Sequence, residues 1–229
     1  MSTNVQLTAE KLRRRKKSNR IAKIILAILL LIIVIMYFVF NVIYNGYHFT
    51  ISLDSNLYYE NNVIIYDDSA YKTYRQQLNV ESLEHFDNIS YKWLPNDLND
   101  YEGSHNGENY MAYSFYIENM GTDTIDYWNE LIIDDVIKNV DEAIRLRVYF
   151  DGEPTTYAKM SALGVPENGT VAFESENIVM SSHISEFKPG DIHKYTIVMW
   201  LEGSDLECTN NIIGGEFKAH MEFKSEIMS

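Results

Sequence analysis

The chain has 229 residues and a formal net charge of −14, and its single cysteine, Cys208, excludes an intrachain disulfide. Residues 1–44 carry eight basic residues and one acidic residue, whereas residues 45–229 carry 11 basic and 32 acidic residues, a net charge of −21. So acidic a segment argues against nucleic acid or anionic lipid as its partner. It favours cations, basic polymers or positively charged proteins, unless the acidity serves only to keep an exposed domain soluble.

Residues 24–44 form an uncharged apolar segment that follows a basic cluster. A helix of this length spans about 31 Å, which matches a bilayer's hydrocarbon core of about 30 Å. The alternative is a cleaved signal peptide, but its apolar region is about 7–15 residues long and precedes a small-residue cleavage site, which this chain lacks. Because basic flanks stay in the cytoplasm, we predict a single-pass signal anchor with residues 45–229 outside.

This topology predicts four regions. Residues 1–23 are a basic cytoplasmic tail and residues 24–44 a transmembrane helix, while residues 45–109 form a membrane-proximal part with strands and an acidic loop. Residues 110–229 are expected to form the body of the extracytoplasmic domain, at the cell membrane. A domain of this size can bury one hydrophobic core.

Several short strands are predicted along the extracytoplasmic part, because apolar and polar residues alternate there or β-forming residues cluster. A weak helical pattern at residues 69–85 puts Tyr71, Tyr74, Leu78 and Leu83 on one face, and residues 95–109 are rich in turn formers and acids. Asp151-Gly152 is a hairpin signal. The expected strands are residues 47–53, 63–66, 110–118, 124–133, 144–150, 155–159, 171–173, 195–201 and 217–223. This pattern predicts a mainly β fold, an antiparallel β-sandwich.

Two stretches carry a family resemblance: residues 115–128, a strand, an Asn-Met-Gly turn and a strand, and residues 187–216. Over about residues 108–224 the chain resembles Gram-positive surface proteins distantly similar to TasA and camelysin. The resemblance implies a jelly-roll-like sandwich at the cell surface, sometimes assembled into fibres. The long basic tail and the uncleaved anchor depart from the secreted members. Camelysin-type proteins are classed as metallopeptidases, but no motif of this chain carries that activity over.

Catalytic signatures are missing from the sequence. None of the six histidines belongs to a His-Glu-x-x-His motif, and no Gly-x-Ser-x-Gly elbow or glycine-rich phosphate loop occurs. Cys208 follows acidic residues, which disfavour a thiolate. We therefore predict that the protein is not an enzyme and has no resident cofactor.

Calcium is the one metal that the sequence favours, because Ca²⁺ takes several oxygen ligands from flexible loops. Two acidic loops offer such ligands, although neither has the spacing of an EF-hand, and a merely solvated acidic loop is the alternative. The candidate ligands are Asp97, Asn99, Asp100, Glu102, Glu202, Asp205 and Glu207, with Asn210 and Asn211 beside them.

The function predicted from these features is a membrane-anchored binding or assembly module of a bacterial cell envelope. Its 17 tyrosines suit a recognition surface, although most of them are expected in the core. A camelysin-like surface metallopeptidase and an accessory or sensory subunit of a membrane complex remain alternatives. Self-association is a further expectation: residues 47–57 either complete their own domain's sheet or pair with the sheet edge of a neighbour.

Overall fold

The computed structural model describes residues 2–45, 49–81, 85 and 87–225. The chain divides into two compact units, residues 1–47 and residues 48–229, and each is described by itself.

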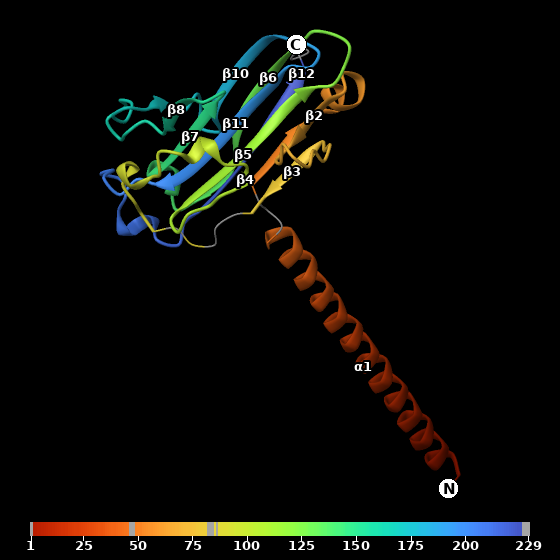
Figure 1. The fold of residues 1–229 in the computed structure, drawn as a ribbon. Helices are drawn as coiled ribbons and strands as arrows, with labels where there is room; N and C mark the ends of the chain where they lie inside the picture. The colour runs from red at the N-terminus through yellow and green to blue at the C-terminus, as the bar shows by residue number, and fades with distance from the viewer. Residues whose placement is uncertain (1, 46–48, 82–84, 86, 226–229) are drawn as a thin grey trace. The chain divides into compact units, whose positions relative to one another are not determined.

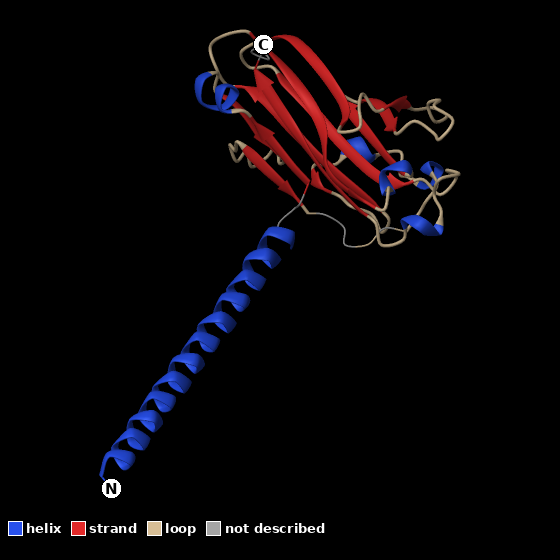
Figure 2. Cartoon of the chain, turned by 180° about the vertical axis from the view of Figure 1, so that it is seen from behind, coloured by secondary structure: helices blue, strands red, loops and turns tan. Residues whose placement is uncertain are grey.

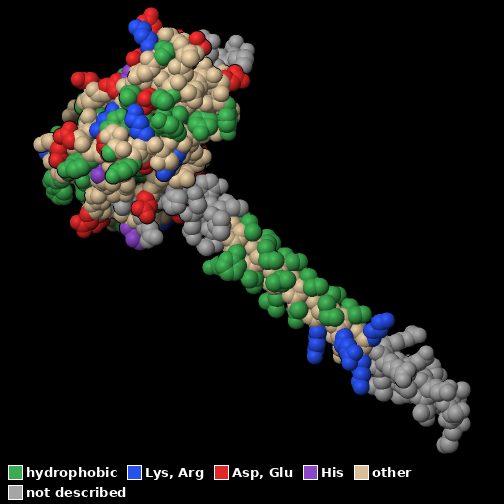
Figure 3. Space-filling view, turned by 45° about the vertical axis from the view of Figure 1, so that its right-hand side comes forward, with side chains coloured by type: hydrophobic (Ala, Val, Ile, Leu, Met, Phe, Trp, Pro, Cys, Tyr) green, Lys and Arg blue, Asp and Glu red, His purple; other side chains and the backbone are tan. Residues whose placement is uncertain are grey.

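The first unit is one helix, α1 (Ser2–Asn45), which runs without a break from the basic to the apolar segment. Its apolar stretch, Asn19–Phe40, has a mean hydropathy of 3.0 and no buried part. Figure 3 shows its apolar side chains, with lysines and arginines gathered before them; these include Lys16, Lys17, Arg20 and Lys23. The helix is long and apolar enough to cross a membrane, a test that a signal sequence also passes.

The second unit consists of two β-sheets (Figures 1 and 2). Sheet A has the strand order β10-β6-β12-β1-β3, and sheet B has the order β2-β5-β11-β7-β8-β9, with β4 also paired to β5. The strands of sheet A are β1 (Phe49–Leu53), β3 (Gln77–Val80), β6 (Ile125–Ile137), β10 (Ile178–Phe187) and β12 (Glu216–Ser225). Those of sheet B are β2 (Val63–Tyr66), β4 (Gly103–Ser104), β5 (Tyr110–Asn119), β7 (Ile144–Phe150), β8 (Glu153–Ala158), β9 (Val171–Ala172) and β11 (Ile192–Leu201).

One hydrophobic core lies between the sheets, and both contribute side chains in alternation along their strands. In β5, for example, Met111, Tyr113, Phe115 and Ile117 are all buried, as the sequence pattern predicts. The mainly β fold, with a sandwich-like pair of sheets and one apolar N-terminal helix, is thus confirmed. Most strand pairs are antiparallel, but β1–β12 and β8–β9 are parallel, so both sheets are mixed.

A second, smaller core covers the outer face of sheet B. Ile89, Leu94 and Leu98, from the segment before β5, pack there on side chains that include Trp200. Short helices interrupt the loops of the domain. They are η1 (Asn56–Glu60), η2 (Tyr91–Trp93), η3 (Leu98–Asp100), η4 (Val140–Glu142) and η5 (Asn210–Ile212).

The outer layer buries residues on the outer face of β7 as well. Arg145 and Tyr149, which alternate with the inward residues of β7, are buried as well, with exposed fractions of 4% and 8%. Tyr149 packs in the smaller core, and the buried Arg145 side chain forms an ion pair with Asp205. The predicted loop at residues 95–109 likewise contains η3 and β4, and its Leu98 is almost completely buried.

Two further predictions differ from the structure. The helix expected at residues 69–85 is wrong: residues 77–80 form β3, where buried Leu78 and Val80 alternate with exposed Gln77 and Asn79. That period of two fits a strand paired to β1. Leu83, which the helical pattern included, lies outside the described residues. Strand β10 was not expected from the sequence, because its serine-rich centre lacks the apolar alternation of the other strands.

The turns behave as predicted. The hairpin between β7 and β8 has positive φ at both Asp151 and Gly152, the geometry that suits a two-residue turn. In the Asn-Met-Gly turn after β5, a Cβ on Gly121 would lie 2.3 Å from the Asn61 carbonyl oxygen, so glycine is required there. Strand β1 is paired on both edges within its own chain, which favours the interpretation that it completes its own sheet.

Candidate functional site

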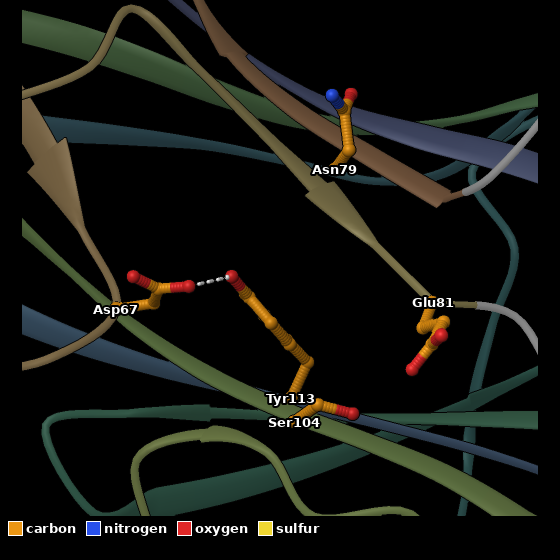
Figure 4. A pocket seen from close by; sticks show the side chains of 5 residues that line it. All are labelled: Asp67, Asn79, Glu81, Ser104 and Tyr113. Atoms are coloured by element: carbon orange, nitrogen blue, oxygen red, sulfur yellow. Dashed lines mark hydrogen bonds between the residues drawn. The ribbon is translucent and has the colours of Figure 1, made fainter.

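A polar cavity of about 420 Å³ opens between the edges of the two sheets (Figure 4). Its five lining residues come from four segments: Asp67 follows β2, Asn79 belongs to β3 and Glu81 follows it, Ser104 belongs to β4 and Tyr113 to β5. The pairing of β4 with β5 sets Ser104 opposite Tyr113. The sheet A side thus contributes Asn79 and Glu81, and the sheet B side contributes Asp67, Ser104 and Tyr113.

A short hydrogen bond orders one wall of this cavity. The Tyr113 ring is in the main core, with an exposed fraction of 3%, and its hydroxyl donates to Asp67 Oδ2 at 2.6 Å. Burial raises the pKa of Tyr113 far above its usual 10, and the hydrogen bond to Asp67 raises it further, against the opposing charge of Arg75. The phenol therefore stays protonated and remains a donor to Asp67.

The cavity is chemically suited to a small polar cation. Two carboxyl groups, from Asp67 and Glu81, line it together with the Ser104 hydroxyl and Asn79, whose amide oxygen accepts from Gln77 Nε2 at 2.8 Å. Carboxylates accept hydrogen bonds from a cationic donor, and such charge-assisted bonds are stronger than neutral ones. The neutral groups suit hydroxyls on the same molecule.

A second polar cluster lies at the end of sheet B where β7 begins. Among the described residues, Glu167, Asp205 and Glu207 each offer a carboxylate oxygen within 4.8 Å of the others. Asp205 Oδ2 forms a very short hydrogen bond with the Arg145 guanidinium, and the two side chains are 1% and 5% exposed. Asp205 Oδ1 accepts from the Glu207 backbone N–H at 2.8 Å, and Glu207 Oε1 accepts from Ala162 N at 2.6 Å. These bonds join β7, the loop between β8 and β9 and the loop after β11 around one ion pair.

Glu167 is the third carboxyl group of this cluster. It lies 3.6 Å from Arg145, a distance that counts as an ion pair, yet its pKa is raised, by burial first and then by the charge of Asp205. Arg145 offsets these effects only in part, because its guanidinium already pairs with Asp205 at much closer range. The ionised form of Glu167 is therefore disfavoured in the folded protein.

The predicted calcium ligands thus fall into three groups. Asp205 and Glu207 are brought together, and Glu167, which the sequence analysis missed, joins them from a loop 38 residues earlier. Glu202 is buried, and hydrogen bonds from Ser204, Trp200 and Tyr91 occupy both of its oxygens. Although burial alone would raise its pKa, these bonds together lower it, so Glu202 acts as a structural anchor of the outer layer.

Three of the four candidates from residues 97–102 form hydrogen bonds with separate partners. Asp97 accepts from the Tyr101 hydroxyl at 2.9 Å, and Asn99 accepts from Thr196 and Lys194 on the outer face of sheet B. Asp100 ends the short helix η3. Glu102 accepts from the Ser69 N–H and the Tyr116 hydroxyl, at 2.9 and 2.7 Å. These contacts fasten the outer layer to the sheet.

Groups with catalytic potential have environments that reduce it. Burial raises the pKa of the Cys208 thiol, and the negative charges of Asp205 and Glu202 raise it further, so the nucleophilic thiolate is disfavoured. Burial also lowers the pKa of His105, whose ring stacks on Tyr101. His220 Nδ1 lies 2.8 Å from Asp134.

Comparisons with known proteins identify no family for this chain. No protein-family model matches it, and no curated protein matches it. Among solved structures, a β-glucosidase from Kluyveromyces marxianus, determined in complex with glucose, is similar over 72% of this chain with 14% identity and a TM-score of 0.27. The chain spans 15% of the length of that enzyme.

The raised pKa of Glu167 predicts a pH-dependent effect of its replacement. Ionising Glu167 costs stability as the pH rises from its ordinary pKa through the raised folded value. Glu167→Gln should therefore raise the unfolding temperature at pH 7 to 8, and the gain should vanish near pH 4, where the carboxyl is protonated in both states. Thermal unfolding across this pH range measures the effect, with Glu176→Gln, on the exposed turn before β10, as the matched control.

The same measurement, repeated with added calcium, tests the metal prediction. If the carboxylate cluster binds Ca²⁺, the ion stabilises the native protein and Glu167→Gln removes that stabilisation.

For the pH prediction, a gain in unfolding temperature from Glu167→Gln that does not depend on pH would contradict the electrostatic explanation.

Proposed function

We propose that this chain is a single-pass membrane protein of a bacterial cell envelope whose β-sandwich lies outside the cytoplasm and binds positively charged ligands without catalysis. The single observation that carries the proposal is the 22-residue apolar stretch of α1, which buries nothing within the protein. In water, each square ångström of exposed apolar surface costs about 25 cal/mol, so a stretch of this size needs a bilayer around it.

The orientation rests on charge. The exposed Lys16, Lys17, Arg20 and Lys23 precede or begin the apolar stretch, and positive side chains are retained on the cytoplasmic side. The segment after α1 carries the net charge of −21. Retention of the apolar helix, rather than its removal as a signal sequence, is part of the proposal, because no small-residue cleavage site follows it.

The binding role rests on the polar cavity and on the acidity of the domain. Two carboxyl groups line the cavity, and a strongly negative domain attracts cations from a distance. The resemblance to TasA- and camelysin-like surface proteins, together with the lack of disulfides, supports a Gram-positive cell surface as the setting. The raised pKa of Cys208 supports a role without nucleophilic catalysis.

Cysteine labelling in intact cells tests the topology. In a Cys208→Ala background, Ala70→Cys places a thiol on an exposed loop of the sandwich and Thr3→Cys places one in the basic tail. A membrane-impermeant maleimide should label Ala70→Cys in intact cells, and Thr3→Cys only after lysis.

The mass of the labelled protein distinguishes an anchor from a signal sequence. An anchored chain keeps residue 3, stays in the membrane fraction and has its full mass. Loss of the N-terminal segment, or labelling of Thr3→Cys in intact cells, would contradict the proposed topology.

The cavity can be probed with two sugars that differ by one charged group. Glucosamine, a cation near neutral pH, should bind the full-length protein more tightly than glucose, because only the ammonium group forms charge-assisted bonds. Glu81→Gln should weaken glucosamine binding by about tenfold or more, whereas Glu176→Gln, far along the chain, should not change it. Calorimetric titration measures both; equal affinity for the two sugars would contradict a cationic ligand.

A further inference from the structure

The edges of the two sheets differ greatly in length. At three of them the outermost strands are short: β3 and β2 have four residues each, and β9 has two. Strand β10, at the remaining edge of sheet A, has ten residues and pairs only with β6 in the described part of the chain. Figures 1 and 2 both show β10 as the outermost strand of its sheet. A long edge strand presents a row of unpaired backbone groups to other chains.

Strand β10 lacks most of the features that keep edges from pairing. It contains no lysine, arginine or proline, and its one charged residue, Glu186, lies next to its end. Register shifts occur between Ile178 and Met180 and between Ile184 and Phe187. The stretch between them, Met180 to Ile184, is regularly paired to β6, so its outer edge has the extended geometry that a further strand requires.

The first residues of β10 already have partners. Glu174 N donates to the Val179 carbonyl oxygen, and Ser175 N donates to that of Ile178, in the turn that precedes the strand. The part of the edge that remains for another strand therefore starts at Met180. On the outer face, His183 stacks on Trp128 at 4.7 Å and Ser181 lies 3.4 Å from Glu130, so side chains of β6 support this stretch.

The sequence of this stretch is compatible with its own copy. Antiparallel pairing centred on Ser182 sets Ser181 opposite His183 and Met180 opposite Ile184. No acidic residues face each other in that register, although most surfaces of a domain with a charge of −21 would repel a second copy. The uncharged edge is therefore where two such acidic domains approach each other at the lowest electrostatic cost.

We propose that two copies of this chain associate through β10, in antiparallel register about Ser182, so that their two five-stranded sheets become one continuous sheet. Backbone hydrogen bonds provide the contact, and the small serine side chains allow the strands to approach. A second copy fits better than a cationic partner, because the edge itself carries no row of carboxylates.

Cross-linking of the full-length protein tests the register. Directly opposite residues of an antiparallel pair have Cα atoms about 4.5–5.5 Å apart, a distance that a disulfide spans. In a Cys208→Ala background, Ser182→Cys should form a disulfide-linked dimer under mild oxidation. Gln77→Cys, on the edge strand β3 of the same sheet, is the matched control and should remain monomeric.

Light scattering on the protein in detergent micelles tests the association itself. The native chain should change from monomer to dimer as its concentration rises. Ser182→Lys, which opposes two like charges across the dimer axis, should weaken association by about tenfold or more. Ser182→Thr and Gln77→Lys should leave it unchanged, and circular dichroism should show that each variant is folded.

Three results would overturn the proposal. The first is a native chain that stays monomeric at all concentrations. The second is a dimer that survives Ser182→Lys, because another surface such as α1 then holds it together. The third is a disulfide-linked dimer through Gln77→Cys but not through Ser182→Cys. The cross-link is informative even if Ser182→Lys fails to fold, because a cysteine in place of serine changes little volume.

Discussion

The sandwich depends on a cluster of four aromatic rings that joins its two sheets. Tyr195 of β11 stacks on Phe115 of β5 at 5.5 Å, and Phe223 of β12 meets the same two rings edge-on at 5.3 and 5.9 Å. Tyr127 of β6 lies beside Phe223, and its hydroxyl is 3.1 Å from that of Tyr195. Such rings bury large apolar areas and have preferred mutual orientations, so they hold the sheets at one separation and one register.

Once the cluster fixes the sheets face to face, the sites of interest are confined to edges and ends. The polar cavity lies where β3 of one sheet approaches β4 and β5 of the other. The carboxylate cluster with Arg145 lies at the end of sheet B, and β10 forms the long free edge of sheet A. The outer layer, anchored by Glu202, covers part of the outer face of sheet B. A binding protein and a self-associating one are therefore compatible, because the cavity and β10 lie at opposite edges of sheet A.

The sequence predicted the features that depend on local pattern. Strands β2 and β7 have the expected bounds, because alternation and β-branched residues mark them directly, and the apolar stretch of α1 is evident from composition. What depends on distant contacts was not predictable. Arg145 appeared to be an outward residue, since nothing local indicates that Asp205, 60 residues later, becomes its partner. The cavity joins Asp67 to Tyr113 across 46 residues, and Glu167 had no neighbouring acid that would mark it as a member of the cluster.

The central claim is that the aromatic cluster holds both sheets, from β1 to β12, as one cooperative fold. Hydrogen exchange on the full-length protein tests it most directly, with Phe223→Ala compared against the native chain. Removing this ring from sheet A should cost about 3–5 kcal/mol. If the account is right, exchange accelerates equally in β1 and β12 and in β5 and β11 of the opposite sheet, because all of them open together. If β5 and β11 keep their native protection while only sheet A opens, the two sheets are independent and the account is wrong.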